Sequence, residues 1–95
     1  MDELEARAHR RLNRMRDLAD EMTAVRVRET SPDGVVTVVV DGSGALQELE
    51  LSTGITKLSP AEFEHVLVST AGQAARRAFA ERAELVTAFN EEAAE

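Results

Sequence analysis

Four arginines near the start of the chain have the spacing that puts side chains on one face of a helix. They stand at positions i, i+3, i+4 and i+7, as Arg7, Arg10, Arg11 and Arg14. Residues three or four apart are neighbours on a helix surface. A guanidinium group presents several donors in a planar fork that fits phosphate oxygens. A helix over this segment would therefore carry a row of cations able to contact the phosphates of a polyanion.

This row stands in an otherwise acidic chain. The formal net charge is −7, yet residues 7 to 16 carry five arginines, one histidine and no acid. Arg10 and Arg11 have no acid three or four residues away, so neither has an ion-pair partner within the helix. The alternative interpretation is a solvated face with local ion pairs, for which three acids have suitable spacing: Glu3, Asp17 and Asp20.

Two further basic pairs are candidates for the same kind of contact. Arg76 and Arg77 are adjacent, and Glu81 can pair only with the second of them. An ordinary surface role is the alternative for this pair. Arg26 and Arg28 share one face of a predicted strand, where they could pair across the sheet, reach a ligand or keep an edge strand solvated.

Nothing in the sequence predicts catalysis or a bound cofactor. The chain has no cysteine, which excludes thiol chemistry and thiolate metal sites. His9 and His65 are far apart and have no neighbouring histidine, so a metal site is not expected. Gly42 and Gly44 belong to a turn and not to a phosphate loop. We therefore expect a protein that is not an enzyme and has no metal, cofactor or small-molecule substrate.

The hydrophobic pattern predicts one α+β domain over residues 1–95, ordered as helix, three-stranded antiparallel meander and long helix. Apolar residues recur at intervals of three and four from Leu4 to Val25, as on an amphipathic helix. The Val35–Val40 run is apolar on both faces, which is typical of a central strand. Ser59 and Glu62 form a capping box around Pro60 at the start of a helix. The expected elements are helix 2–23, strands 25–30, 35–41 and 45–52, a connector over residues 54–58 and helix 60–90. Both helices are expected to pack at the faces or ends of the sheet.

The second helix is too long for the sheet that it would cover. About 31 residues give a helix of roughly 46 Å, whereas a seven-residue strand spans about 23 Å. The far end still carries three apolar side chains that would be costly to leave in water. We therefore expect a dimer whose interface includes Leu85, Val86 and Phe89. The chain shows no signal peptide and no apolar run long enough to cross a membrane, so a cytoplasmic location is expected.

The order of these pieces resembles the YbaB/EbfC family of bacterial nucleoid-associated proteins, with an actinobacterial-type character. The matching segments are the run Gly34–Gly42, the third-strand triplet Leu49-Glu50-Leu51, the helix opening Phe63–Val68 followed by Ala71, and then Ala74-Ala75-Arg76-Arg77. This resemblance implies a tweezer-like homodimer that binds double-stranded DNA with little sequence specificity. Arg76 and Arg77 match the paired basic residues of the family, whereas the Arg-rich first helix departs from the Met- and Gln-rich one that is common there. The candidate DNA contacts are therefore Arg76 and Arg77 by resemblance, and by their spacing Arg7, Arg10, Arg11 and Arg14.

A second function is compatible with the same fold. A protein–protein or secretion-associated adaptor could use the dimer without binding DNA. The acidic balance and the absence of aromatic side chains around the arginine row favour the adaptor, and the uninterrupted basic segment of the first helix favours DNA.

Overall fold

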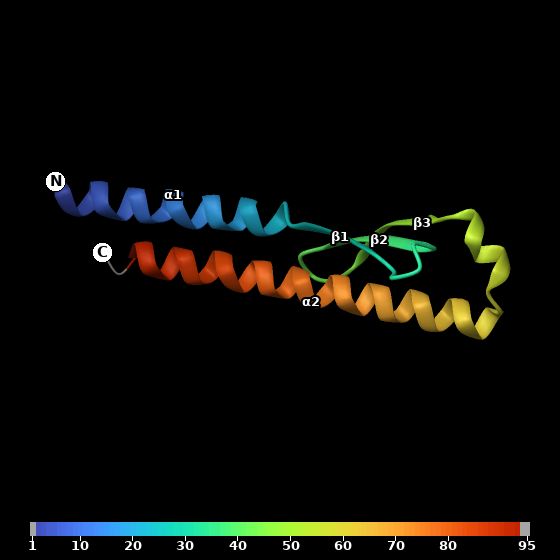
Figure 1. The fold of residues 1–95 in the computed structure, drawn as a ribbon. Coiled ribbons are helices and arrows are strands. Elements are labelled where there is room, and N and C mark those ends of the chain that lie inside the picture. Colours follow the sequence, from blue (N-terminus) through green and yellow to red (C-terminus); the bar gives the residue numbers. More distant parts are fainter. Residues whose placement is uncertain (1, 94–95) are drawn as a thin grey trace.

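The computed structural model describes residues 2–93 and confirms the predicted order of elements (Figure 1). A first helix leads into three strands, a short 3₁₀ helix and a second, longer helix. Their bounds are α1 Glu3–Thr23, β1 Arg26–Thr30, β2 Val36–Asp41, β3 Leu46–Leu51, η1 Thr53–Lys57 and α2 Pro60–Ala93. The strands form one antiparallel sheet in the order β1-β2-β3. The central strand is therefore the valine run, as its two apolar faces predict.

Local chemistry at the turns and caps explains where these elements begin and end. Gly34 and Gly44 have φ angles of 75° and 84°, which only glycine adopts without a steric penalty. Ahead of α2, the Glu62 backbone N–H donates to Ser59 Oγ at 3.1 Å, and the Ser59 N–H donates to Glu62 Oε1 at 2.9 Å. This reciprocal pair is the predicted capping box. The bond from the Ser59 N–H holds the pKa of Glu62 below its ordinary value, because it favours the ionised carboxylate.

The core lies between the inner face of the sheet and one stripe of α2. The buried side chains from the sheet are valines, and those from α2 are small: Val27, Val36, Val38, Val40, Thr70, Ala74 and Ala78. Small residues let the helix axis lie close to the strands, and branched valines fill the space between them. Residues at both ends of this stripe, including Phe63 and Leu85, extend the packing.

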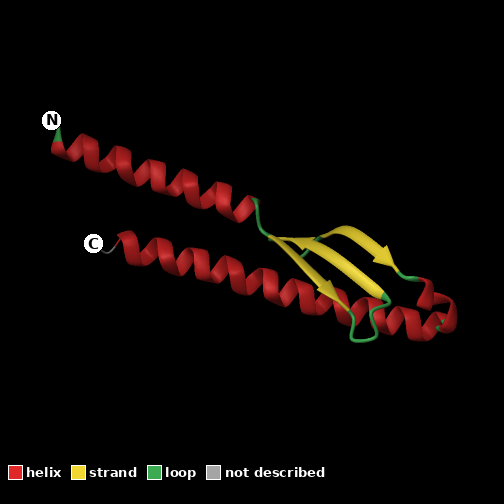
Figure 2. Cartoon of the chain, turned by 45° about the horizontal axis from the view of Figure 1, so that its top comes forward, coloured by secondary structure: helices red, strands yellow, loops and turns green. Residues whose placement is uncertain are grey.

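Helix α2 continues well past the sheet, and α1 returns beside the part that protrudes. The 34 residues of α2 make a helix of about 51 Å, while the six residues of β2 span about 20 Å. The two helices run antiparallel and bring both chain ends to the same end of the molecule (Figures 1 and 2). The result is an elongated particle with extents of 68 × 18 × 15 Å. We call α1 together with residues 82–93 the helical arm.

Two details differ from the sequence-based expectation. Residues 54–58, expected to be a plain connector, contain most of the 3₁₀ helix η1, which Ser52 begins by accepting a hydrogen bond from the Gly54 N–H. Helix α1 packs mainly on α2 and not on the sheet, and none of its residues is buried. An amphipathic pattern shows that one face of a helix is covered, but it does not identify the covering element.

Gly42 lies where the arm joins the sheet. A Cβ at this buried position would come within 3.0 Å of the Met22 carbonyl oxygen, 3.2 Å of Arg82 Cδ and 3.4 Å of Val25 Cβ. The Arg82 guanidinium also donates to the Gly42 carbonyl oxygen at 3.0 Å. The end of α1, the middle of α2 and the turn after β2 therefore meet around a residue without a side chain.

We expect Gly42→Ala to lower the free energy of unfolding by about 1–3 kcal/mol, because overpacking a tight site forces the backbone apart. Chemical denaturation monitored by circular dichroism measures this change. The control is Gly72→Ala, where the added Cβ would lie 3.5 Å from Arg76 Nη1 and helix propensity favours alanine by up to about 1 kcal/mol. Equal stability of Gly42→Ala and the parent would contradict this account of the junction.

Asp41 organises the turn between β2 and β3. Its Oδ1 accepts hydrogen bonds from the Ser43 N–H at 2.9 Å, the Ser43 hydroxyl at 2.7 Å and the Ala45 N–H at 3.0 Å. These donors, with the Ser43 hydroxyl first, hold the pKa of Asp41 below its ordinary value. Because the folded pKa lies below the unfolded one, the ionised carboxylate stabilises the fold above the unfolded pKa. That contribution is lost as the pH falls through the folded pKa.

We expect Asp41→Asn to melt at a lower temperature than the parent at pH 7. The difference should shrink as the pH falls below about 4, where the parent carboxylate also becomes neutral. Thermal melts at several pH values test this convergence. A difference that stays constant down to pH 2 would show that the charge of Asp41 does not matter to the turn.

Candidate nucleic-acid interface

Three of the four arginines in the predicted row are exposed on the outer half of α1. Arg7, Arg10 and Arg11 all have high solvent exposure. They follow one another over about one turn of a helix that projects beyond the sheet (Figure 1). Positive groups on a projecting helix can approach a large polyanion without a clash from the body of the protein. The structure therefore leaves these three side chains accessible to phosphates.

Arg14 differs from the other members of the row because it is half-buried against α2. It lines a small cavity of about 170 Å³ between the helices, together with the carboxylate-bearing residues Asp17, Glu21 and Glu92. Its Nε is buried and has no hydrogen-bond partner within residues 2–93. A guanidinium in this position faces acids of its own chain. Arg14 is thus the member of the row least available to an external phosphate.

The apolar group expected at a dimer interface is divided by the fold. Leu85 and Phe89 line the same cavity as Leu18 of α1, and both are half-buried. Val86 does not line this cavity and is 38% exposed. Helix α1 of the same chain thus covers part of the surface for which a second subunit was expected. A role for this group at a dimer interface remains a prediction.

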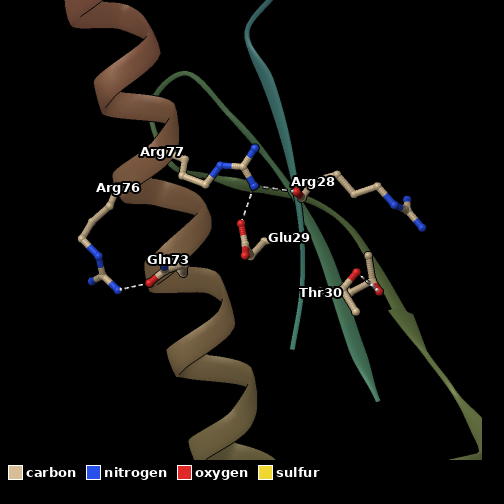
Figure 3. Close-up of polar contacts among 7 residues, drawn as sticks. Arg28, Glu29, Thr30, Gln73, Arg76 and Arg77 are labelled. Carbon is tan, nitrogen blue, oxygen red and sulfur yellow. Dashed lines mark hydrogen bonds and ion pairs between the residues drawn. The ribbon is translucent and has the colours of Figure 1, made fainter. Parts of the chain in front are cut away.

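The two arginines near the middle of α2 have different surroundings (Figure 3). The Arg77 guanidinium forms an ion pair with Glu29 and donates to the Arg28 carbonyl oxygen at 3.1 Å. It therefore ties α2 to the β1 edge of the sheet. Arg76 projects to the other side of the helix, where its Nη2 donates to Gln73 Oε1 at 2.8 Å. Of this pair, Arg76 has the freer guanidinium.

The fold does not bring the two basic groups together. Arg14 lies beside Ala88, which is eleven residues beyond Arg77 on α2. At 1.5 Å per residue, Arg14 is about 15–20 Å from Arg76 and Arg77 along the helix, and the exposed Arg7, Arg10 and Arg11 are farther away. They could contact one extended ligand at two places, but they do not form a single pocket for a compact one.

On the sheet face that points away from α2, Arg28 pairs across the sheet, which is one of the alternatives that the sequence left open for the strand arginines. Its Nη2 lies 2.5 Å from Glu50 Oε2 on β3, and both side chains are more than half exposed. Arg26 Nη1 instead donates to the carbonyl oxygens of Val25 and Thr23. Because their cationic groups bond within the chain, these two arginines are weaker candidates for a phosphate contact than Arg10 or Arg11.

An exposed apolar face on β3 and α2 was not expected from the sequence. Leu46, Leu49 and Leu51 of β3 are 42–50% exposed, and Val68 and Phe79 of α2 are 65% and 50% exposed. The sequence did contain a signal for this face. Val68, Ala75 and Phe79 are spaced seven and four residues apart, so they lie on one stripe of the helix. That stripe lies on a different side of α2 from the buried stripe of Thr70, Ala74 and Ala78.

His9 and His65 are both exposed. Within residues 2–93, no three histidine, cysteine or acidic side chains are grouped closely enough to hold a metal ion. No helix of that part of the chain is long and apolar enough to cross a membrane.

Comparison with known proteins agrees with this architecture. The chain is similar to the crystal structure of an uncharacterised protein from Helicobacter pylori, with a TM-score of 0.63 and 17% identity. The alignment covers 79% of this chain and 88% of that one, and at this identity the likeness concerns the fold alone. A comparison with curated proteins finds no match. The model of the YbaB/EbfC DNA-binding family matches residues 1–93, and the chain therefore belongs to that family.

Proposed function

We propose that this protein binds double-stranded DNA with low sequence specificity, as a homodimer associated with the nucleoid in the cytoplasm. Membership of a DNA-binding family supports a DNA partner. The observation that carries the proposal is the exposed arginine row on the projecting arm, Arg7, Arg10 and Arg11. The mechanism is binding, with no catalytic step.

Phosphate contacts explain both the affinity and the low specificity. Arginine side chains on one helix face reach the sugar-phosphate backbone, which is the same in every sequence. Specificity requires contacts to base edges in a groove, and contacts to phosphates alone supply none. Binding of this kind releases counterions, so its affinity falls steeply as salt rises.

The acidic residues of the chain limit this affinity. The formal net charge of −7 repels DNA at long range. At short range, Glu92 lines the cavity that contains Arg14, and neighbouring Glu91 is exposed on the same arm. A dimer would offset this weakness, because two arms on one duplex turn the second contact into an intramolecular one.

An adaptor that recognises a protein partner is the alternative function. The specific observation in its favour is the net negative charge, together with the absence of tryptophan and tyrosine, which leaves few side chains for base stacking. It predicts no salt-sensitive binding to duplex DNA at any protein concentration that keeps the chain folded.

We expect Arg10→Glu combined with Arg11→Glu to weaken binding to all duplex sequences alike. The slope of log affinity against log salt should flatten by roughly 0.9 for each phosphate contact that is lost. Charge reversal adds repulsion, so the loss of affinity should exceed the counterion contribution. Fluorescence anisotropy with two unrelated duplexes at several salt concentrations measures both effects.

The matched control is Arg16→Glu combined with Lys57→Glu. Both positions are exposed, and the formal charge changes by the same four units. Arg16 lies on the opposite face of α1 from Arg7 and Arg11, and Lys57 lies in η1. Equal loss of affinity in the two double variants would show that the row has no special role. A parent that shows no salt-sensitive binding would replace the DNA proposal with the adaptor.

We expect the neighbouring arginines of α2 to separate stability from binding. Arg77→Ala should lower the free energy of unfolding by about 0.5–1.5 kcal/mol, because it removes a half-exposed ion pair and a hydrogen bond to β1. Arg76→Ala should change it by less than about 0.5 kcal/mol and should weaken DNA binding. Denaturation and anisotropy on both variants test this. A loss of stability in Arg76→Ala together with a loss of DNA binding in Arg77→Ala would contradict the proposed roles.

A further inference from the structure

We propose that Arg14 is a further phosphate contact and that Glu92, in the last turn of α2, competes with phosphate for it. The inference rests on the DNA binding of the proposed function and names the control of one residue of the arginine row. It differs from the general effect of the net charge, because one carboxylate acts on one guanidinium. Binding of a duplex would displace Glu92 from Arg14.

Arg14 lies where the arginine row meets the stripe of α1 that packs on α2. It is three residues after Arg11 and four after Arg10, and residues at these spacings are neighbours on a helix surface. Leu18 follows Arg14 at the next interval of four, and both line the cavity between the two helices. The row therefore leads directly into the interior of the helical arm, and a ligand that follows the row reaches Arg14 next.

Of the three acids that line this cavity, Glu92 lies on the side of the exposed arginines. The other two belong to α1 and follow Arg14 in the sequence, so they lie toward the sheet. Glu92 follows Ala88 on α2, and the antiparallel helices place later residues of α2 nearer the extremity where both chain ends lie (Figure 1). A phosphate that approaches from the exposed arginines thus meets Glu92 before it reaches Arg14.

The surroundings of Arg14 do not satisfy its guanidinium. Its Nε is buried without a hydrogen-bond partner among residues 2–93, and an unpaired buried donor costs free energy. Phosphate oxygens form strong charge-assisted hydrogen bonds with a guanidinium. The side chain as a whole is only half-buried, so rotation about its side-chain bonds can bring the charged group to the surface of the arm. Arg14 therefore gains hydrogen bonds when a phosphate replaces its present surroundings.

Glu92 is a competitor that a duplex can displace. It is exposed, and an ion pair at an exposed position contributes little to stability. It also lies in the last turn of α2, where the negative end of the helix dipole disfavours a carboxylate. The guanidinium of Arg14 offsets part of this repulsion, which keeps Glu92 beside it in the free protein. A duplex presents many phosphates at once, and their combined attraction for the row exceeds that of one carboxylate.

The test measures the affinity of Glu92→Gln for duplex DNA by fluorescence anisotropy at several salt concentrations. Without its competitor, Arg14 should add one phosphate contact, so the slope of log affinity against log salt should steepen by roughly 0.9. The affinity should rise about two- to fivefold more than in the control variant, which is the range expected for loss of an exposed ion pair. Circular dichroism establishes that each variant is folded.

The matched control is Glu91→Gln, which removes the same charge from the adjacent residue. Glu91 is exposed and does not line the cavity, so its variant reports the effect of net charge alone. A second pair of variants carries Arg14→Gln together with Glu92→Gln or Glu91→Gln. In this background the two glutamate substitutions should have equal effects, because the additional gain depends on the guanidinium of Arg14.

The outcomes separate this inference from the DNA proposal. If the parent binds duplex DNA and Glu92→Gln gains no more than Glu91→Gln, the competition is wrong while the DNA contact stands. An additional gain that persists in the Arg14→Gln background would also overturn the role of Arg14. If neither the parent nor Glu92→Gln shows salt-sensitive binding, the DNA proposal and this inference both fail.

Discussion

The mismatch in length between α2 and the sheet determines most of this structure. A helix of about 51 Å cannot be covered by strands that span about 20 Å. The protruding part must find another partner, and α1 takes that position by running back along it (Figure 2). The formation of the arm, its extension away from the sheet and the placement of both chain ends at one extremity all follow from this mismatch in length.

The same helix also decides which apolar side chains remain in water. Its buried stripe is built from Thr70, Ala74 and Ala78, which bring it close to the valines of β1 and β2 but give it little width. A narrow stripe covers two strands and not three. The leucines of β3 and the neighbouring Phe79 therefore stay half exposed. The close-packed core and the uncovered leucines of β3 therefore both result from the small residues on the buried stripe of α2.

The antiparallel arrangement of the helices also determines where charged side chains lie along the molecule. The arm carries the exposed arginine row near the start of α1 and exposed glutamates near the end of α2. Because the helices are antiparallel, these opposite charges lie near the same extremity, where the negative end of the α2 dipole adds to the glutamates. The arm is thus electrically mixed, and only the side chains turned away from α2 can offer an uncompensated positive charge. Near the sheet, Arg77 is ion-paired with Glu29. Of these two arginines of α2, Arg76 is therefore the one comparable to the exposed arginines of α1.

Apart from η1, the sequence alone determined the elements, because each of them is specified by local chemistry. Periodicity gave the helices and the central valine strand, glycine and proline gave the turns, and Ser59 with Glu62 gave the start of α2. The family resemblance rested on the same local pieces. Tertiary structure alone decided that α1 packs on α2, that Arg14 turns inward, that Leu85 and Phe89 are covered within the chain and that β3 is not. Each of these outcomes depends on a surface that lies dozens of residues away in sequence, and local spacing carries no information about such a surface.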